Sequence, residues 1–362
     1  MWRQWVRLTF TWLRTWPGIV CLVCVVLIAG LIFGARAVLD EEAPTTCGEG
    51  ARCTVGTHFV HRGDTANGTR RFDTYGCAPG KDESGPELIY PLDVAEDGFL
   101  ALELSALDDG ADVDIHLLSA EDPQRCLARG HWRLGRWLTA GRYWVVADTW
   151  VDGSGKAHSG AFTLTGHLTT AADLEGAGMG PQVASEALYA LGVGWADTET
   201  KRFDYAITDF SRPSSEARLW IFDLLTGEQL WRLHVTHGSA SSDPDDATRA
   251  VTFSNIPESH QSSLGMIRTA ESYVGEYGVS HRLDGLEEGF NDNVRRRFIV
   301  LHPWAGSRPA YVKAHGMTAP SWGCAAIDDE VAPEVVARLA NGALMLFWHP
   351  ESEWHRRSKY MP

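Results

Sequence analysis

The N-terminal segment constrains the fold of this chain most strongly, because it contains a long run without a charged side chain. Residues 17–35 read PGIVCLVCVVLIAGLIFGA, which is 19 consecutive uncharged residues. At about 1.5 Å per helical residue, such a run nearly matches a hydrocarbon core of about 30 Å. The sequence therefore predicts a transmembrane signal-anchor helix over residues 17–36.

The charges on either side of this run predict which end is exported. Three arginines precede it, whereas Asp40, Glu41 and Glu42 follow it. Because positive charges stay on the cytoplasmic side, residues 1–16 are expected in the cytoplasm and the remainder outside it. A cleaved signal peptide is the alternative, since residues 35–37 form an A-x-A site, but the run exceeds the usual apolar region of such peptides. In either case the rest of the chain is exported.

Residues 47–170 are predicted to form a β-sandwich accessory domain. Five short segments alternate or are continuously apolar, and Gly, Asp or Pro clusters separate them, as in antiparallel sandwiches. These segments are residues 87–94, 99–104, 113–118, 142–147 and 161–168. The signals at 112–118, 139–145 and 160–164 resemble the bacterial pre-peptidase C-terminal domain. This resemblance implies a small β-sandwich module that carries no catalytic residue.

Four of the seven cysteines fall in this accessory domain: Cys47, Cys53, Cys77 and Cys126. In an exported domain they are expected to form two disulfides, and the sequence leaves the three possible connectivities open. A zinc site is the alternative, although no C-x-x-C pair is present. The acidic residues within 108–114 would suit calcium, but a solvated acidic turn is the simpler interpretation.

A second domain is expected after a change in composition. Residues 171–185 are small and glycine-rich, which predicts a linker, and residues 186–195 are expected to form a short helix. The second domain then extends over residues 186–362. Its strands are expected at residues 205–209, 218–223, 229–235, 297–302 and 343–348, and a helix at 331–340. The fold class is therefore mainly β: a transmembrane helix, a β-sandwich and a β-rich second domain with a few helices.

Cys324 is the exported cysteine left without an expected partner, which makes it a candidate nucleophile. It follows Ser321, Trp322 and Gly323. A glycine before a nucleophile permits a tight turn whose backbone N–H groups can point at a reacting carbonyl oxygen. A histidine base must also reach the sulfur, and His302 ends a predicted strand 22 positions earlier. The alternative is a buried and inert thiol.

The second domain resembles the murein L,D-transpeptidases, the catalytic-cysteine enzymes that cross-link peptidoglycan. The matching groups, in chain order, are residues 207–211, 218–220, 235–238, 253–255, 262–265, 273–278, 282–286, 291, 297–302 and 321–324. The family implies peptidoglycan stem peptides as the substrate. It also implies a location on the periplasmic side of the inner membrane in a bacterial envelope.

The resemblance implies that Cys324 is the nucleophile and His302 its base, with the backbone amides of Trp322, Gly323 and Cys324 as the oxyanion hole. The thiolate would attack the diaminopimelate–D-alanine bond of a tetrapeptide stem. The resulting thioester would pass its acyl group to the amine of another stem in a 3→3 cross-link. Carbapenems are plausible inhibitors. Further candidates for substrate contacts are Ser321, His237, Ser263, Arg282 and His315.

Simpler roles remain open for these further candidates. His237 could make a structural hydrogen bond, Arg282 could pair with Asp284, and Ser263 could shape a loop. His315 is expected on a loop that could cover the site. The three arginines at 295–297 are expected to be the solvated start of a strand.

Two departures from the family pattern affect the immediate surroundings of the catalytic pair. Pro303 follows the base where the family usually has glycine or serine, and Ala325-Ala326 follow the nucleophile where it prefers Pro-Ala. Neither departure removes a catalytic group.

Three functions remain after this reading of the sequence. Besides transpeptidation, the same fold could act as a murein L,D-carboxypeptidase or endopeptidase, or bind peptidoglycan without turnover. No cofactor and no metal is expected for the chemistry. The net charge of −15 argues against nucleic acid as a partner, because the chain would repel phosphates.

Overall fold

The computed structural model describes residues 57–362 apart from 199, 201 and 351. The predicted cytoplasmic segment, the signal-anchor helix, Cys47 and Cys53 lie outside these residues. Within the described part of the chain, no helix is both long enough and apolar enough to cross a membrane.

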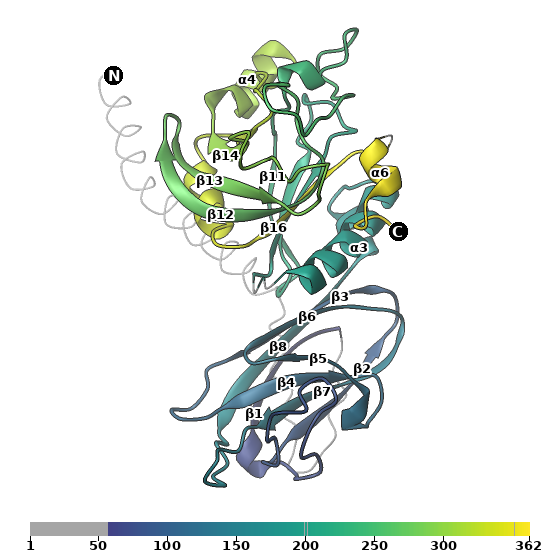
Figure 1. The fold of residues 1–362 in the computed structure, drawn as a ribbon, viewed down its shortest axis with the longest axis vertical. Coiled ribbons are helices and arrows are strands. Elements are labelled where there is room, and N and C mark those ends of the chain that lie inside the picture. The colour runs from purple at the N-terminus through teal and green to yellow at the C-terminus, as the bar shows by residue number, and fades with distance from the viewer. Residues whose placement is uncertain (1–56, 199, 201, 351) are drawn as a thin grey trace, which may run out of the picture. The chain divides into compact units, whose positions relative to one another are not determined.

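Residues 58–170 form two four-stranded antiparallel sheets, as the alternating apolar pattern predicts (Figure 1). One sheet has the order β1-β8-β3-β6 and the other β2-β7-β4-β5. The strands are β1 (His58–Asp64), β2 (Leu88–Val94), β3 (Gly98–Ser105), β4 (Val113–Leu118), β5 (Cys126–Gly130), β6 (Arg133–Leu138), β7 (Gly141–Thr149) and β8 (Ala161–Thr170). Strands β1, β5 and β6 are additional to the five predicted segments.

The core of the sandwich is built from the inward residues of both sheets. Leu92, Leu100, Leu102, Ile115 and Leu117 are fully buried there. Burying a side chain of this size contributes about 1.5–3 kcal/mol of stability. The period-two pattern of the sequence is therefore the main determinant of this module.

The linker predicted over residues 171–185 is wrong, because most of this segment is helical. Strand β8 continues directly into α2 (Ala171–Gly176), and α3 (Pro181–Asp197) begins within the segment. Thr170 and Asp173 form a capping box at the start of α2. The small residues that suggested flexibility instead allow close packing, since Ala184 of α3 is fully buried.

The second domain is organised around one mixed sheet of eight strands in the order β11-β10-β9-β16-β12-β13-β14-β15. Its strands are β9 (Asp204–Asp209), β10 (Leu219–Asp223), β11 (Glu228–Leu233), β12 (Gly265–Gly275), β13 (Gly278–Gly285), β14 (Val300–Pro303), β15 (Ala325–Ile327) and β16 (Leu344–Trp348). The remaining helices are α4 (Pro309–His315), α5 (Ala332–Arg338) and α6 (Glu353–Arg357). Strands β12 and β13 form a long curved hairpin (Figure 1).

The edge of this sheet brings together the two segments that carry the candidate catalytic pair. Strands β14 and β15 are parallel, with Leu301 opposite Ala325 and His302 opposite Ala326. The strand predicted over 297–302 starts later than expected, because Phe298 has a φ of 56°. A left-handed residue cannot continue a strand. The chain therefore turns just before it enters β14.

Candidate active site

Cys324 immediately precedes β15 and is partly exposed. Its thiol donates toward the carbonyl oxygen of Phe298 at 3.6 Å. Burial raises the pKa of the Cys324 thiol, whereas the backbone N–H of Val300 and the positive charge of Arg297 act to lower it. The thiol therefore lies between a desolvating environment and two groups that stabilise its anion.

His302 lies on β14 and is 6% exposed. Its Nδ1 is 2.9 Å from the carbonyl oxygen of Pro303. Because a carbonyl oxygen only accepts hydrogen bonds, Nδ1 carries the proton and Nε2 keeps its lone pair. Burial also lowers the pKa of His302, which favours the neutral ring. The carbonyl of Pro303 therefore fixes the tautomer of the His302 ring, as a glycine or serine carbonyl at this position could also do.

The sheet register places His302 beside the strand that follows Cys324. His302 is paired with Ala326, which is two positions after Cys324. Cys324 and His302 are therefore presented from adjacent segments at one edge of the sheet.

The turn before Cys324 depends on Gly323, which has a φ of +112°. A Cβ at this position would lie 2.6 Å from the carbonyl oxygen of Gln261, so no larger residue fits without movement. The hydroxyl of Ser321 braces the turn: it donates to the carbonyl oxygen of Cys324 at 2.9 Å and accepts from the Gly323 amide at 3.2 Å. Ser321 therefore has a structural role within the site, and Trp322 is exposed beside it.

His237 and Ser263, both considered for substrate contacts, are buried and make internal hydrogen bonds. Arg218 donates to Nδ1 of His237 at 2.7 Å, so Nε2 carries the proton and donates to Ser242 at 3.0 Å. Burial lowers the pKa of His237 to about 3. Its backbone still contacts the site, because the Ser321 amide donates to the His237 carbonyl at 3.0 Å. The structural alternative therefore describes the His237 side chain.

Arg282 and His315 have surroundings that differ from those expected. The Arg282 guanidinium lies over the rings of Tyr273 and Phe298, at 4.3 and 5.5 Å from their centroids. Its expected partner Asp284 instead accepts a hydrogen bond from Arg295. The loop predicted around His315 is wrong, because His315 ends helix α4, where its ring stacks on Tyr311 at 3.9 Å.

Sequence reasoning missed Arg297, which is half-buried rather than part of a solvated strand start. Its guanidinium donates to two carbonyl oxygens and two hydroxyls between residues 254 and 263. Its neighbours Arg295 and Arg296 are exposed, as expected. A run of three arginines gives no signal that only the third turns inward.

Exposed aromatic side chains flank the candidate catalytic pair and were also missed. The ring of Tyr277 stacks on His302 at 5.1 Å and on Trp304 at 5.8 Å. On the other segment, Trp322 stacks on His260 at 4.9 Å with nearly parallel planes. Tyr277 and Trp322 are 52% and 74% exposed, so both can contact a bound molecule.

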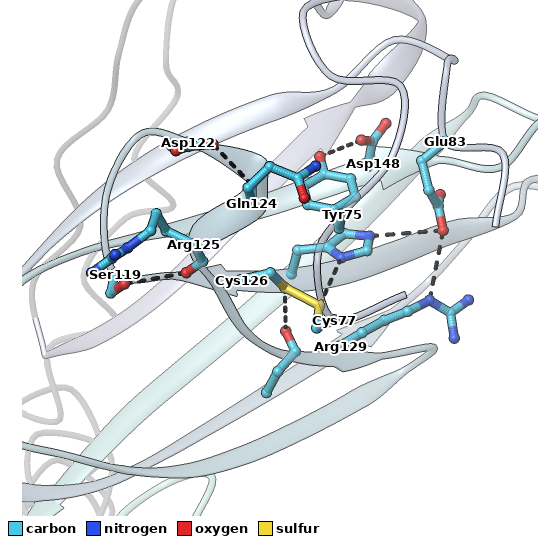
Figure 2. Close-up of a disulfide and its surroundings, with 12 residues drawn as sticks. Tyr75, Cys77, Glu83, Ser119, Asp122, Gln124, Arg125, Cys126, Arg129 and Asp148 are labelled. Atoms are coloured by element: carbon cyan, nitrogen blue, oxygen red, sulfur yellow. Dashed lines mark hydrogen bonds and ion pairs between the residues drawn. A yellow bond between two sulfur atoms is a disulfide. The ribbon is translucent and has the colours of Figure 1, made fainter. Parts of the chain in front are cut away.

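The accessory domain contains a disulfide between Cys77 and Cys126, one of the pairings left open by the sequence (Figure 2). Arg129 points toward Glu83 in the same region, with Nε and Oε1 3.6 Å apart. The hydroxyl of Tyr75 donates to Asp148. Burial raises the pKa of Glu83 to about 9 and that of Asp148 to about 8.

Side chains of the types that bind metal ions also lie close together in this domain. Asp112 and Asp114 lie close to His131. Arg129 donates a hydrogen bond to Asp114, and Asp108 accepts one from the Ala161 amide. These contacts favour the interpretation of the acidic turn as structural rather than as a calcium site.

Comparison with known families found a match in the second domain. Residues 178–348 match the L,D-transpeptidase catalytic domain family. This match agrees with the resemblance seen in the sequence of the second domain. The match starts before residue 186, consistent with α3 being part of the domain. A comparison with curated proteins found no match.

Comparison with solved structures found neighbours of low similarity. An L,D-transpeptidase from Mycobacterium smegmatis is 10% identical, with 68% of this chain and 82% of that chain covered and a TM-score of 0.25. The pre-peptidase C-terminal domain of a Bacillus anthracis collagenase is 14% identical, with coverages of 34% and 99% and a TM-score of 0.23. A periplasmic inhibitor of g-type lysozyme from Aeromonas hydrophila is 10% identical, with coverages of 35% and 94% and a TM-score of 0.22.

Proposed function

We propose that this protein is a peptidoglycan L,D-transpeptidase with Cys324 as nucleophile and His302 as general base. The sulfur attacks the carbonyl carbon of the diaminopimelate–D-alanine bond, and the thiol proton passes through His302 to the leaving amine of D-alanine. The thioester is then attacked by the amine of a second stem, which gives a 3→3 cross-link and restores the thiol.

The observation that carries this proposal is the tautomer of His302, which the carbonyl oxygen of Pro303 fixes. Nδ1 is engaged by the Pro303 carbonyl oxygen at 2.9 Å, which leaves Nε2 as the basic atom. The β14–β15 register brings this residue to the strand that follows Cys324. A nucleophile whose base is held in a fixed tautomer by a third group is the arrangement that covalent catalysis requires.

The oxyanion would be stabilised by the backbone amides of the turn at residues 322–324. The Gly323 amide donates to the Ser321 hydroxyl at 3.2 Å, so it would have to share or exchange this contact when a tetrahedral intermediate forms. The amides of Trp322 and Cys324 complete the set of donors. Removing a donor of this kind from an enzyme typically costs about 10²–10³ in rate.

We place this activity on the periplasmic side of the inner membrane, with the chain anchored by residues 17–36. The support is the uncharged run of the sequence, with arginines before it and acids after it. A catalytic domain on that side would meet stem peptides directly.

The test uses full-length protein with a carbapenem and, separately, with muropeptides that carry tetrapeptide stems. We expect a covalent carbapenem adduct by intact mass, its loss in Cys324→Ala, and muropeptide dimers by chromatography. The matched control is Cys77→Ala with Cys126→Ala, which removes a disulfide outside the catalytic domain.

The products separate the rival functions. Monomeric tripeptides without dimers would replace transpeptidation by carboxypeptidase activity, and cleavage of existing cross-links would indicate an endopeptidase. Binding of muropeptides to folded protein, with neither adduct nor product, would leave only a peptidoglycan-binding role.

A further inference from the structure

Arg297 connects the segment 254–263 to the turn that carries Cys324. Its Nη1 donates to the Ser254 carbonyl oxygen and, at 2.7 Å, to the Ser263 hydroxyl. Its Nη2 donates to the Ser259 hydroxyl at 3.0 Å and to the Gln261 carbonyl oxygen at 2.6 Å. Four acceptors within ten residues are thus held by one planar guanidinium, which no other side chain can do with the same geometry.

The segment 254–263 needs such support, because its backbone is strained at two residues and most of it is exposed or half-buried. Glu258 and His260 have φ values of 60° and 53°, a region that side chains rarely adopt. The same segment forms the wall behind Gly323, where the Gln261 carbonyl oxygen leaves no room for a Cβ. His260 also stacks on Trp322. A displacement of the segment would therefore remove the wall of the nucleophile turn.

The charge of Arg297 is not neutralised by an acid. No ion pair involves Arg297 among the described residues, whereas Arg295 pairs with Glu271 and Asp284. Phe298, the next residue after Arg297, accepts the Cys324 thiol proton through its carbonyl oxygen at 3.6 Å, and the positive charge of Arg297 acts to lower the pKa of the thiol. The other titratable side chains on the segments around the sulfur are Glu258, His260, Arg295, Arg296 and His302, and burial favours the neutral form of His302.

We propose that Arg297 is a positioning residue of the reaction: it clamps the segment 254–263 behind the Cys324 turn and supplies the positive charge that stabilises the attacking sulfur. This inference deepens the proposed function and rests on it. Burial disfavours both the thiolate of Cys324 and the imidazolium of His302, so the two groups by themselves form little of the ion pair. A fixed cation beside the sulfur lowers the free energy of the thiolate without disturbing the neutral base.

The test is alkylation of Cys324 by iodoacetamide, which reads the thiolate directly and needs no peptidoglycan. Rates are measured in full-length protein between about pH 6 and pH 10 by mass spectrometry of the Cys324 peptide. The variants are Arg297→Met, which removes the charge and the clamp, and Arg297→Lys, which keeps only the charge. Arg296→Gln is the matched control, because that neighbouring arginine is exposed.

For Arg297→Met we expect alkylation at neutral pH to slow by at least about threefold, while the alkaline plateau stays unchanged. Arg297→Lys should keep the wild-type pH profile but speed backbone hydrogen exchange in residues 254–263. Arg296→Gln should change neither quantity. A wild-type pH profile in Arg297→Met, or an equal shift in Arg296→Gln, would overturn the electrostatic role.

The lysine variant keeps the proposal testable if the methionine variant does not fold. Unchanged exchange of residues 254–263 in Arg297→Lys would overturn the clamp. The two hypotheses fail in different assays. If the wild-type protein gives no muropeptide product, the proposed function fails, whereas the role of Arg297 fails only if the rate of Cys324 alkylation does not depend on Arg297.

Discussion

Burial acts on both members of the candidate catalytic pair and favours the neutral form of each. It raises the pKa of the Cys324 thiol and lowers the pKa of the His302 imidazole. When both groups are neutral, the thiol transfers its proton to the imidazole only as the sulfur attacks the carbonyl carbon. The pair is therefore expected to act as a nucleophile with a general base and not as a preformed ion pair.

Replacement of His302 should therefore produce a defect that high pH relieves. We expect His302→Gln to slow carbapenem acylation of Cys324 at neutral pH by about 10²–10⁴. Above the pKa of the thiol, hydroxide performs the deprotonation and the gap to wild type should narrow. Intact-mass kinetics across the pH range measure this, with His315→Gln as the control. A gap that stays constant at high pH would assign His302 a purely structural role.

Gly323 should tolerate no side chain, for a reason that combines conformation and contact. Its φ of +112° strains any other residue, and an added Cβ would meet the Gln261 carbonyl oxygen at 2.6 Å. Gly323→Ala should therefore displace the turn and reduce acylation by about 100-fold or more, since catalysis is sensitive to misplacement of about 1 Å.

Gly289→Ala separates strain from displacement. Gly289 also has a positive φ, of +82°, but an added Cβ would meet no atom within 4 Å. This variant should lose stability without losing acylation, as measured by thermal unfolding and intact mass. Equal acylation in both variants would mean that the Gln261 wall is not required.

At the scale of secondary-structure elements, the hairpin of β12 and β13 controls the environment of the base. Tyr277 lies at its tip and stacks on His302, and Gly278 beside it approaches Pro303. The exposed end of the hairpin thus covers a residue on the neighbouring strand β14.

Tyr277→Ala should expose His302 to water. The pKa of His302 should then rise toward the ordinary value, because a more exposed imidazolium is better solvated. A larger fraction of the base is then protonated at mildly acidic pH. We expect acylation several-fold slower near pH 6, with recovery near pH 8. Tyr277→Phe should retain the wild-type profile. Val274→Ala, at an exposed position on the same hairpin, is the control, and a profile equal to that of Tyr277→Ala there would refute a specific role of the stack.

The sequence predicted the helices and strands in which the spacing of apolar residues matches the side that is buried. Strand β4 lies where the alternating run predicted it, and α5 lies within the predicted helix. The hairpin β12–β13 was missed because its outer half is exposed and carries polar residues on both faces. Helix α2 and the start of α3 were mistaken for a linker because small residues can pack closely as well as be flexible, whereas the rest of α3 lies over the helix predicted at 186–195.

The same distinction applies to the candidate site. Cys324, Gly323 and His302 could be selected because nucleophile, turn and base have recognisable residue types. Arg297 could not, since its four acceptors are 34 to 43 positions away in the sequence. Only the folded loop brings those acceptors around one guanidinium.

At the scale of the whole molecule, the two domains should respond differently to pH. The accessory domain buries the carboxyl groups of Glu83 and Asp148, whose pKa values rise to about 9 and about 8. A raised carboxyl pKa means that the folded state binds the proton more tightly than the unfolded state. Its contribution to stability is complete below the ordinary carboxyl pKa of about 4 and is lost as the pH rises through the folded value.

The stability of the accessory domain should therefore fall between about pH 6.5 and pH 8.5, by at most about 1.4 kcal/mol per pH unit for each carboxyl group. His116, whose pKa burial lowers to about 3, is neutral in the folded protein throughout this window, whereas an unfolded histidine is still about half protonated near pH 6.5. Its ionisation therefore opposes the decline at the acidic end of the window and contributes almost no slope above about pH 7.5. Asp148→Asn should flatten the decline by removing one titrating group. Asp93→Asn is the control, since Asp93 is exposed and bound to Arg142.

Calorimetry of the full-length variants across this window measures how the stability of each variant changes with pH. The transition that contains the accessory domain should move to lower temperature as the pH rises, and the move should be smaller in Asp148→Asn than in Asp93→Asn. Equal slopes in the two variants would mean that Asp148 is already ionised in the folded protein. The Tyr75 hydroxyl would then be donating to a carboxylate and not to a carboxylic acid, and the proton retained by the cluster would have to lie on Glu83.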